Sequence, residues 1–128
     1  MTCFIIDDDM DDREMFEIAV KGLDRGIEIH SATDCSAALS RLKADSSFVP
    51  DIIFLDLNMP GMNGKECLPE LKKLAWLSDI PIIIYTTSST QKDKKDTLAL
   101  GASDFLTKET TIHQLRNSLT TIFKKHGG

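Results

Sequence analysis

Acidic, hydroxyl and amino side chains follow short apolar runs of this chain, each at the point where a run ends. They are Asp7-Asp8-Asp9 after the first run, Asp56 after the third, Thr86-Thr87-Ser88 after the fourth and Thr107-Lys108 after the fifth. If the runs are parallel strands of one sheet, their carboxyl ends meet at a single edge, which is where doubly wound proteins bind ligands. The sequence therefore predicts a site at which carboxylates, hydroxyls and one amine converge.

The consecutive acids Asp7 and Asp8 indicate a metal site. Carboxylates crowded in a cleft repel one another, so at least one of them takes up a proton unless a cation is present. Mg²⁺ suits such a site because it binds through few carboxylates, keeps several waters and shares its shell with phosphate. For Asp9, Asp11 and Asp12 we expect a different role, as the solvated acidic start of the first helix, where the helix dipole favours negative charge.

Asp56 differs from the other acids because it ends an otherwise apolar run and continues into the segment LNMPG at 57–61. A carboxylate held there beside a metal can attack a phosphoryl donor and form an acyl phosphate. Phosphoryl transfer needs mainly positioning and charge neutralisation. Lys108 offers an ammonium and Thr86 a hydroxyl for the phosphoryl oxygens, so we expect both at the site, although Lys108 taken alone would be interpreted as a surface lysine.

The elements that must position these groups are strands that alternate with helices. The apolar runs are rich in β-branched residues and are separated by longer segments of helical period, a pattern typical of an α/β domain with a parallel sheet. We expect strands at Cys3–Asp7, Ile27–Ser31, Ile52–Asp56, Ile80–Tyr85 and Ser103–Thr107. The run around Glu28 and His30 alternates between polar and apolar residues, which predicts an edge strand. The expected fold is α/β, a doubly wound sheet of five parallel strands with five helices.

The segment from Gln91 to Gly101 has few apolar residues, because positions 92–96 read Lys-Asp-Lys-Lys-Asp. A helix with so narrow an apolar stripe is expected to pack loosely and to be able to shift. Asp34 is expected to cap the start of the second helix, and Gly101 to end the fourth.

The bulk properties limit the function. At 128 residues the chain has the size of one domain, which we expect to span residues 1–128 without an attached effector. A formal net charge of −5 argues against direct nucleic-acid binding. No apolar run approaches the ~20 residues that span a bilayer, and no secretory leader is apparent, so we expect a cytoplasmic protein without membrane insertion. Cys3, Cys35 and Cys67 form no close pair in the sequence, and reduced, mostly buried thiols are expected.

Over essentially its whole length the sequence resembles the receiver domain of two-component response regulators. Four stretches carry the resemblance: FIIDDD at 4–9, PDIIFLDLNMPGMNG at 50–64, IPIIIYTT at 80–87 and GASDFLTK at 101–108. All four occur in the order and at the spacing of that family. The resemblance implies a flavodoxin-like sheet with strand order 2-1-3-4-5 and a stand-alone regulator in phosphorelay signal transduction.

The resemblance also implies roles at the acidic site. Asp56 would be the phospho-acceptor, becoming a 4-aspartylphosphate after transfer from a histidine kinase or a phosphotransfer protein. Asp8 would be the chief metal ligand, Asp7 would bind the metal through water, and the backbone carbonyl of Asn58 would complete the protein's share of the Mg²⁺ shell. The chain would then be a signalling switch rather than an enzyme, with no chemistry beyond its own phosphorylation and dephosphorylation.

On the other side of the acceptor, Thr86 and Lys108 would hold the phosphoryl group, and Phe105 would occupy the aromatic switch position. In that scheme Thr86 moves toward the phosphate, Phe105 turns inward, and the surface of the fourth helix, fifth strand and fifth helix changes for a downstream protein partner. Plain core packing explains an aromatic ring at Phe105 equally well.

One residue departs from the family pattern. Glu109 follows Lys108, where the family usually has a proline that is often preceded by a cis peptide. A cis bond costs about 2.5–4 kcal/mol before a non-proline residue. We therefore expect a trans or more mobile loop after Lys108.

Three other functions remain open at this point. A flavodoxin-type cofactor binder shares the expected fold, but Asp7-Asp8-Asp9 would repel the cofactor phosphate. A haloacid-dehalogenase-like phosphohydrolase would use Asp7 and Asp9 as an Asp-x-Asp pair, yet Asp11 stands where threonine or valine is expected, and the chain leaves no room for a cap domain. A degenerate receiver that binds partners without phosphorylation is the third, and the complete set of acids, threonine and lysine argues against it.

Overall fold

The computed structural model describes residues 1–23 and 25–126. Its strands are β1 (Thr2–Ile6), β2 (Glu28–Ala32), β3 (Ile52–Leu55), β4 (Ile82–Thr86) and β5 (Asp104–Thr107). All pair in parallel, in the order β2-β1-β3-β4-β5. The predicted α/β fold and its strand order are therefore confirmed.

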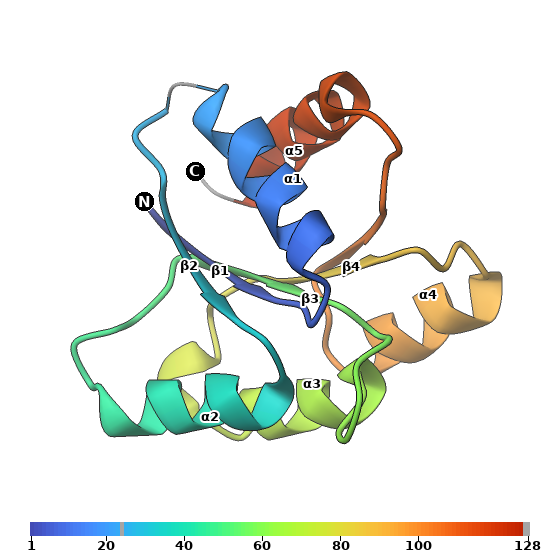
Figure 1. The fold of residues 1–128 in the computed structure, drawn as a ribbon. Coiled ribbons are helices and arrows are strands. Elements are labelled where there is room, and N and C mark those ends of the chain that lie inside the picture. The colour runs from blue at the N-terminus through green and yellow to red at the C-terminus, as the bar shows by residue number, and fades with distance from the viewer. Residues whose placement is uncertain (24, 127–128) are drawn as a thin grey trace.

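Helices cover both faces of this sheet. They are α1 (Met10–Lys21), α2 (Cys35–Ala44), α3 (Gly64–Lys72), α4 (Gln91–Ala99) and α5 (Ile112–His126), with a short 3-10 turn, η1, at Ala75–Leu77. Figure 1 shows α1 and α5 together on one face, and α2, α3 and α4 on the other. The site residues must therefore emerge between two helical layers, at an edge of the sheet.

Two apolar cores follow from the alternation of side chains along each strand. On the α1/α5 face, Ile5 and Phe54 of the sheet pack with Phe16 and Phe123 of the helices. The next residue along β1, Phe4, points to the other face and belongs to the core formed with α2 and α3. Every residue of β3 and β4 is buried, as expected for strands covered on both sides. β2 has a mixed pattern and lies at one edge, which confirms the prediction from its alternating sequence.

Capping residues determine where the helices begin and end. The side chain of Asp34 accepts a hydrogen bond from the amide of Ala37 at 2.7 Å, which confirms the predicted cap of α2. Gly101 follows α4 with a positive φ of 107°, a conformation that favours glycine and that ends the helix. In α3, Asn63 and Glu66 form a reciprocal capping box, which the sequence analysis had not identified.

The prediction of reduced thiols is wrong for two of the three cysteines. Cys35 on α2 and Cys67 on α3 form a disulfide with a Cα–Cα distance of 5.9 Å, and both are buried. The two residues are 32 positions apart in the sequence and become neighbours only because α2 and α3 pack against each other on one face of the sheet. Cys3 is free and buried, as predicted.

No helix within residues 1–23 and 25–126 is both long enough and apolar enough to cross a membrane.

Candidate functional site at the carboxyl edge of the sheet

Two buried carboxylates stand side by side where neighbouring strands end. Asp7 follows β1 and Asp56 follows β3, and their side chains are 0% and 5% exposed. Their backbones are fixed by the sheet: the Asp7 amide donates to the carbonyl of Ala32 at 3.1 Å, and the Asp56 amide donates to that of Ile6 at 3.0 Å. The strand ends therefore hold both acids in place before any ligand binds.

The acids at this edge have the chemistry of a site for a hard divalent cation. Asp7, Asp8 and Asp56 each offer one oxygen, and these oxygens lie within 4.8 Å of one another. Asp7 Oδ2 is buried and, among the described residues, accepts no well-directed hydrogen bond, although the Lys108 ammonium lies 2.8 Å away. Burial raises the pKa of Asp7 to about 6, and the nearby Lys108 ammonium only partly opposes this. A carboxylate cluster with an unsatisfied oxygen and an exposed member, Asp8, fits a partly hydrated divalent cation.

Lys108 supplies the positive charge of the site. Its Nζ lies 2.8 Å from Asp7, 2.7 Å from Asp12 and 3.2 Å from Asp56, and its side chain is only 7% exposed. Burial alone would lower the pKa of this ammonium, but the close contacts with the Asp12 and Asp7 carboxylates and the charge of Asp56 raise it well above its usual value. Lys108 therefore stays protonated across the physiological pH range.

The loop that carries Lys108 reaches the acids without a proline. The described residues contain no cis peptide, so the bond from Lys108 to Glu109 is trans. The Lys108 amide donates to the carbonyl of Thr86 at 2.6 Å, and Glu109 Oε1 accepts a hydrogen bond from the Ser118 hydroxyl at 3.1 Å. These contacts tie the loop to β4 and α5.

Thr86 and Asn58 connect the segment after β3 to the end of β4. Thr86 is fully buried at the end of β4, and its Oγ1 lies 3.4 Å from Asn58 Nδ2. The Asn58 amide donates to Asp56 Oδ1 at 3.2 Å, so this residue contacts both the acid and the threonine. Two open clefts meet here: one of about 400 Å³ is lined by Asp56 and Lys108, and one of about 560 Å³ extends toward α3 and α4. Asp8 and Asn58 line both clefts, so the site is accessible from the surface.

The described structure thus brings two buried acids together with an exposed third acid and a lysine, and places Thr86 next to Asn58. The family model of the response regulator receiver domain matches residues 3–120. The protein belongs to this family. Receiver domains are signalling switches rather than enzymes, and they bind a divalent metal at an acidic pocket, where this receiver has Asp7, Asp8 and Asp56.

Similar proteins agree with this assignment. The phosphate regulon transcriptional regulatory protein PhoB of Pseudomonas aeruginosa is 30% identical over 129 residues, which cover 98% of this chain and 53% of PhoB. The chain thus spans about half the length of that relative. The Mn²⁺-bound response regulator Rcp1 is 27% identical, with a TM-score of 0.83 over 96% of this chain and 91% of Rcp1. The phosphorylated cyanobacterial phytochrome response regulator RcpA is 26% identical, with a TM-score of 0.87 over 98% and 92%.

Phe105 lies beside the receiver's site rather than in it. It is on β5 opposite Ile84 of β4, and its half-buried ring packs against the core on the α2/α3 face. The Lys94 ammonium of α4 lies 5.9 Å from the ring centroid. Phe105 is therefore in contact with both the sheet and α4.

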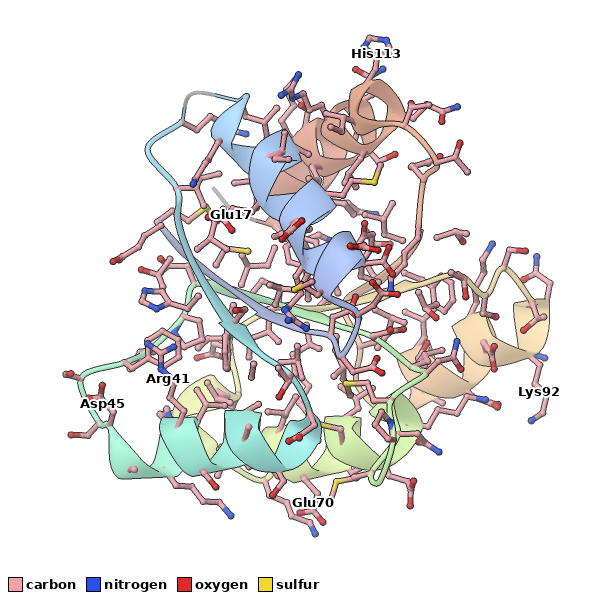
Figure 2. The ribbon with its side chains drawn as sticks, in the orientation of Figure 1. Glu17, Arg41, Asp45, Glu70, Lys92 and His113 are labelled. Carbon is pink, nitrogen blue, oxygen red and sulfur yellow. A yellow bond between two sulfur atoms is a disulfide. The ribbon has the colours of Figure 1, made fainter. Side chains whose placement is uncertain are left out.

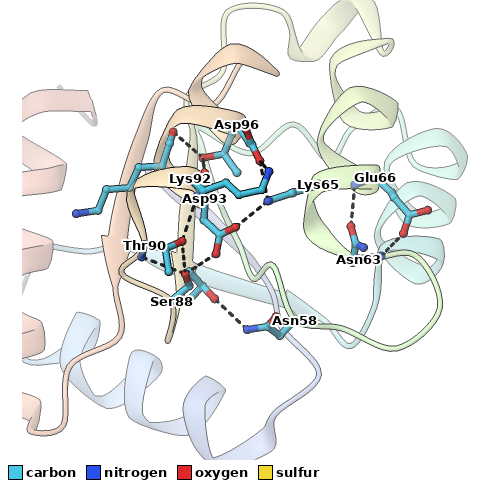
Figure 3. A network of polar contacts seen from close by, with 12 residues as sticks. Asn58, Asn63, Lys65, Glu66, Ser88, Thr90, Lys92, Asp93 and Asp96 are labelled. Carbon is cyan, nitrogen blue, oxygen red and sulfur yellow. Dashed lines mark hydrogen bonds and ion pairs between the residues drawn. The ribbon is translucent and has the colours of Figure 1, made fainter.

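Figure 3 shows a polar network that joins α3, α4 and the loop after β4. Lys65 Nζ lies 2.7 Å from Asp93 Oδ1 and 3.0 Å from Asp96 Oδ2, and the Ser88 hydroxyl also contacts Asp93. The Lys65 ammonium and the Ser88 hydroxyl lower the pKa of Asp93 to about 2. Apolar packing contributes little to holding α4 on the sheet, because Thr97 is the one buried residue of this helix. This agrees with the loose packing predicted from the sequence. Charge pairs thus add a connection that the sequence analysis had missed.

Two further residues of the site were not predicted. Asp12 was expected to be a solvated acid of the first helix, but it is paired with Lys108. Gly64 lies so close to the segment after β3 that a Cβ atom there would meet the Asp56 carbonyl oxygen at 2.4 Å and the Leu57 Cα at 2.7 Å. Gly64 belongs to the stretch that carries the resemblance, but only the structure gives the steric reason for it.

The three histidines lie away from this site. Figure 2 shows His113 pointing outward at the N-terminal end of α5. His30 contacts Arg41 at the β2 edge, and His126 pairs with Asp104.

Proposed function

We propose that Asp56 accepts a phosphoryl group from the phosphohistidine of a histidine kinase or a phosphotransfer protein. The observation that carries this proposal is the position of the Asp56 carboxylate, 3.2 Å from the Lys108 ammonium and next to the oxygens of Asp7 and Asp8. Family membership supports the proposal.

The chemistry is a displacement at phosphorus. A carboxylate oxygen of Asp56 attacks, a P–O bond forms, and the P–N bond to the donor imidazole breaks with its electron pair leaving on nitrogen. Mg²⁺ held by Asp7, Asp8, Asp56 and the backbone carbonyl of Asn58 would neutralise charge on the phosphoryl oxygens. Lys108 does the same from the opposite side, and the Thr86 hydroxyl donates to a phosphoryl oxygen.

The response is a change of surface. Thr86 turns toward the phosphoryl group, the Phe105 ring moves into the space beside it, and the surface formed by α4, β5 and α5 changes. We propose that a downstream protein, rather than a nucleic acid, reads this surface, in keeping with the net charge of −5. In this proposal the receiver catalyses only its own phosphorylation and dephosphorylation.

Incubation with acetyl phosphate and Mg²⁺, followed by intact mass spectrometry, tests this function. We expect a single phosphoryl adduct that requires the metal and is absent from the Asp56→Asn variant. The isosteric asparagine keeps the volume of the buried side chain but is a far weaker nucleophile, so the comparison isolates the chemistry.

The other outcomes identify the alternatives. Repeated turnover of an unrelated phosphomonoester would indicate a phosphohydrolase, which family membership does not favour. No adduct with either acetyl phosphate or a phosphorylated histidine-containing donor would indicate a receiver that acts only by binding partners.

A further inference from the structure

The three carboxylates around Lys108 are not equivalent. Asp7 and Asp56 belong, with Asp8, to the group of oxygens suited to a divalent cation. Asp12 is outside that group, and its carboxylate makes the shortest of the three contacts with Lys108 Nζ, at 2.7 Å.

A bound divalent cation makes this difference important. Its two positive charges offset the attraction of Asp7 and Asp56 for the ammonium, and at such short distances the cation and the ammonium also repel each other. The cation offsets the attraction between Asp12 and the Lys108 ammonium much less, because Asp12 is outside the group of metal-binding oxygens. Asp12 is thus the one partner of the ammonium, among the described residues, whose attraction the metal does not share.

The backbone of Asp12 is fixed in a helix, whereas the Lys108 ammonium is four carbons away from its own backbone. Asp12 is in the first turn of α1, and its amide donates to the capping carboxylate of Asp9 at 3.1 Å. Lys108 has a trans peptide after it, and the contacts of its amide and of Glu109 fix the loop but not the flexible four-carbon side chain. An acid whose backbone is fixed in α1 therefore faces an ammonium at the end of a longer side chain from the β5–α5 loop.

We propose that Asp12 is a positioning residue that holds the Lys108 ammonium beside Asp56 while the divalent cation is bound. The proposal rests on phosphorylation of Asp56. Asp12 itself touches neither the acceptor nor the phosphoryl group and acts through Lys108.

The test compares the initial rates of phosphorylation by acetyl phosphate at saturating Mg²⁺. Asp12→Asn is expected to slow the reaction roughly fivefold, which corresponds to about 1 kcal/mol of lost transition-state stabilisation. Asp11→Asn is the matched control, because Asp11 is in the same helical turn, is exposed and makes no contact with Lys108. It removes the same charge and the same interaction with the helix dipole, so its rate should remain close to that of the wild type. Asp12→Glu should recover part of the lost rate because it restores the charge.

A double-mutant cycle separates positioning from general structural effects. In a Lys108→Met background, Asp12→Asn should cause no further loss of the residual rate, since there is no ammonium to position. Thermal unfolding of the Asp12 and Asp11 variants checks that any difference in rate does not come from loss of fold.

Two results would overturn the inference. One is an Asp12→Asn rate equal to that of Asp11→Asn, and the other is an equal loss with and without Lys108. If the wild-type chain forms no adduct with either acetyl phosphate or a phosphorylated histidine-containing donor, the proposed function fails, and the failure is visible before any variant is made.

Discussion

The residues at the carboxyl edge of the sheet carry an excess of negative charge. Lys108 is paired with three carboxylates, Asp7, Asp12 and Asp56, and Asp8 stands next to them without contacting the ammonium. One ammonium cannot balance four carboxylates in a partly buried site. This imbalance is the physical reason why we expect the site to take up a divalent cation, whose charge would in turn offset that of a phosphoryl group.

Gly64 packs closely against the segment after β3, and a substitution at this position tests that close approach. Gly64→Ala would place a Cβ atom 2.4 Å from the Asp56 carbonyl oxygen, where neither backbone can move easily. We expect a loss of about 2 kcal/mol in the free energy of unfolding, measured by urea denaturation. Gly22→Ala is the matched control, because the atoms that its Cβ would meet belong to the flexible end of the Arg116 side chain. Equal effects of the two substitutions would contradict the close approach at Gly64.

At the scale of elements, the disulfide between Cys35 and Cys67 joins two helices of the same layer. It closes a loop between residues 32 positions apart, which restricts the unfolded chain. We expect reduction, or replacement of both cysteines by alanine, to lower the free energy of unfolding by about 3–4 kcal/mol. Urea denaturation with and without dithiothreitol measures this, and reductant should have no effect on the doubly substituted chain. Alkylation of both thiols in the unreduced, denatured protein would show that the bond is absent.

The pair between Lys65 of α3 and Asp93 of α4 predicts a pH dependence of stability. The pKa of Asp93 is lowered from 3.8 to about 2 in the folded protein, so its contribution to stability is complete above the unfolded value and disappears as the pH falls toward 2. Lys65→Met removes the largest part of that contribution and leaves the hydrogen bonds from Ser88 and Thr90. The stability difference between wild type and variant should therefore be constant between about pH 5 and 7 and should shrink below about pH 4. Lys92→Met, which removes only an exposed contact with Asp96, should give a smaller change. A difference that is independent of pH would exclude the pair as its source.

The sequence indicated the three central strands best, because β1, β3 and β4 are apolar runs that end at polar residues, whereas β2 alternates. It indicated α4 as a weakly packed helix because this segment has few apolar residues. It did not indicate Cys35 with Cys67, Lys65 with Asp93 or Asp12 with Lys108. The members of each of these pairs lie on different elements, and their contact depends on how helices and loops pack rather than on local periodicity.

Across the whole molecule, Asp56 lies at the end of the central strand, with β4 and β5 on one side and β1 and β2 on the other. These two sides are connected to the site by different contacts. β5 is tied to the end of β4 by the Lys108 amide on the Thr86 carbonyl and by the Thr107 hydroxyl on the Ser88 carbonyl. β2 is at the opposite edge of the sheet, separated from β3 by β1. A displacement of Thr86 should therefore spread toward α4, β5 and α5 more than toward β2 and α2.

Amide hydrogen exchange can show this direction. After phosphorylation we expect altered exchange rates in α4, β5 and α5, and unchanged rates in β2 and α2. Ser88, in the segment after β4, contacts Asp93 of α4, β5 is hydrogen-bonded to the end of β4, and Glu109 in the next loop is hydrogen-bonded to α5. Asp56→Asn treated with the same donor should show no change in any element. A response that is uniform over the sheet, or confined to β2 and α2, would contradict this view of the switch.

The central claim is that Asp56, among six closely spaced acids at one edge of the sheet, forms the acyl phosphate. Borohydride reduces an acyl phosphate to the alcohol, so treatment of the phosphorylated protein converts the acceptor aspartate to homoserine, which peptide mass spectrometry locates. We expect homoserine at position 56 and aspartate at positions 7, 8, 9, 11 and 12. Homoserine at any of those five positions, with position 56 unchanged, would contradict the account.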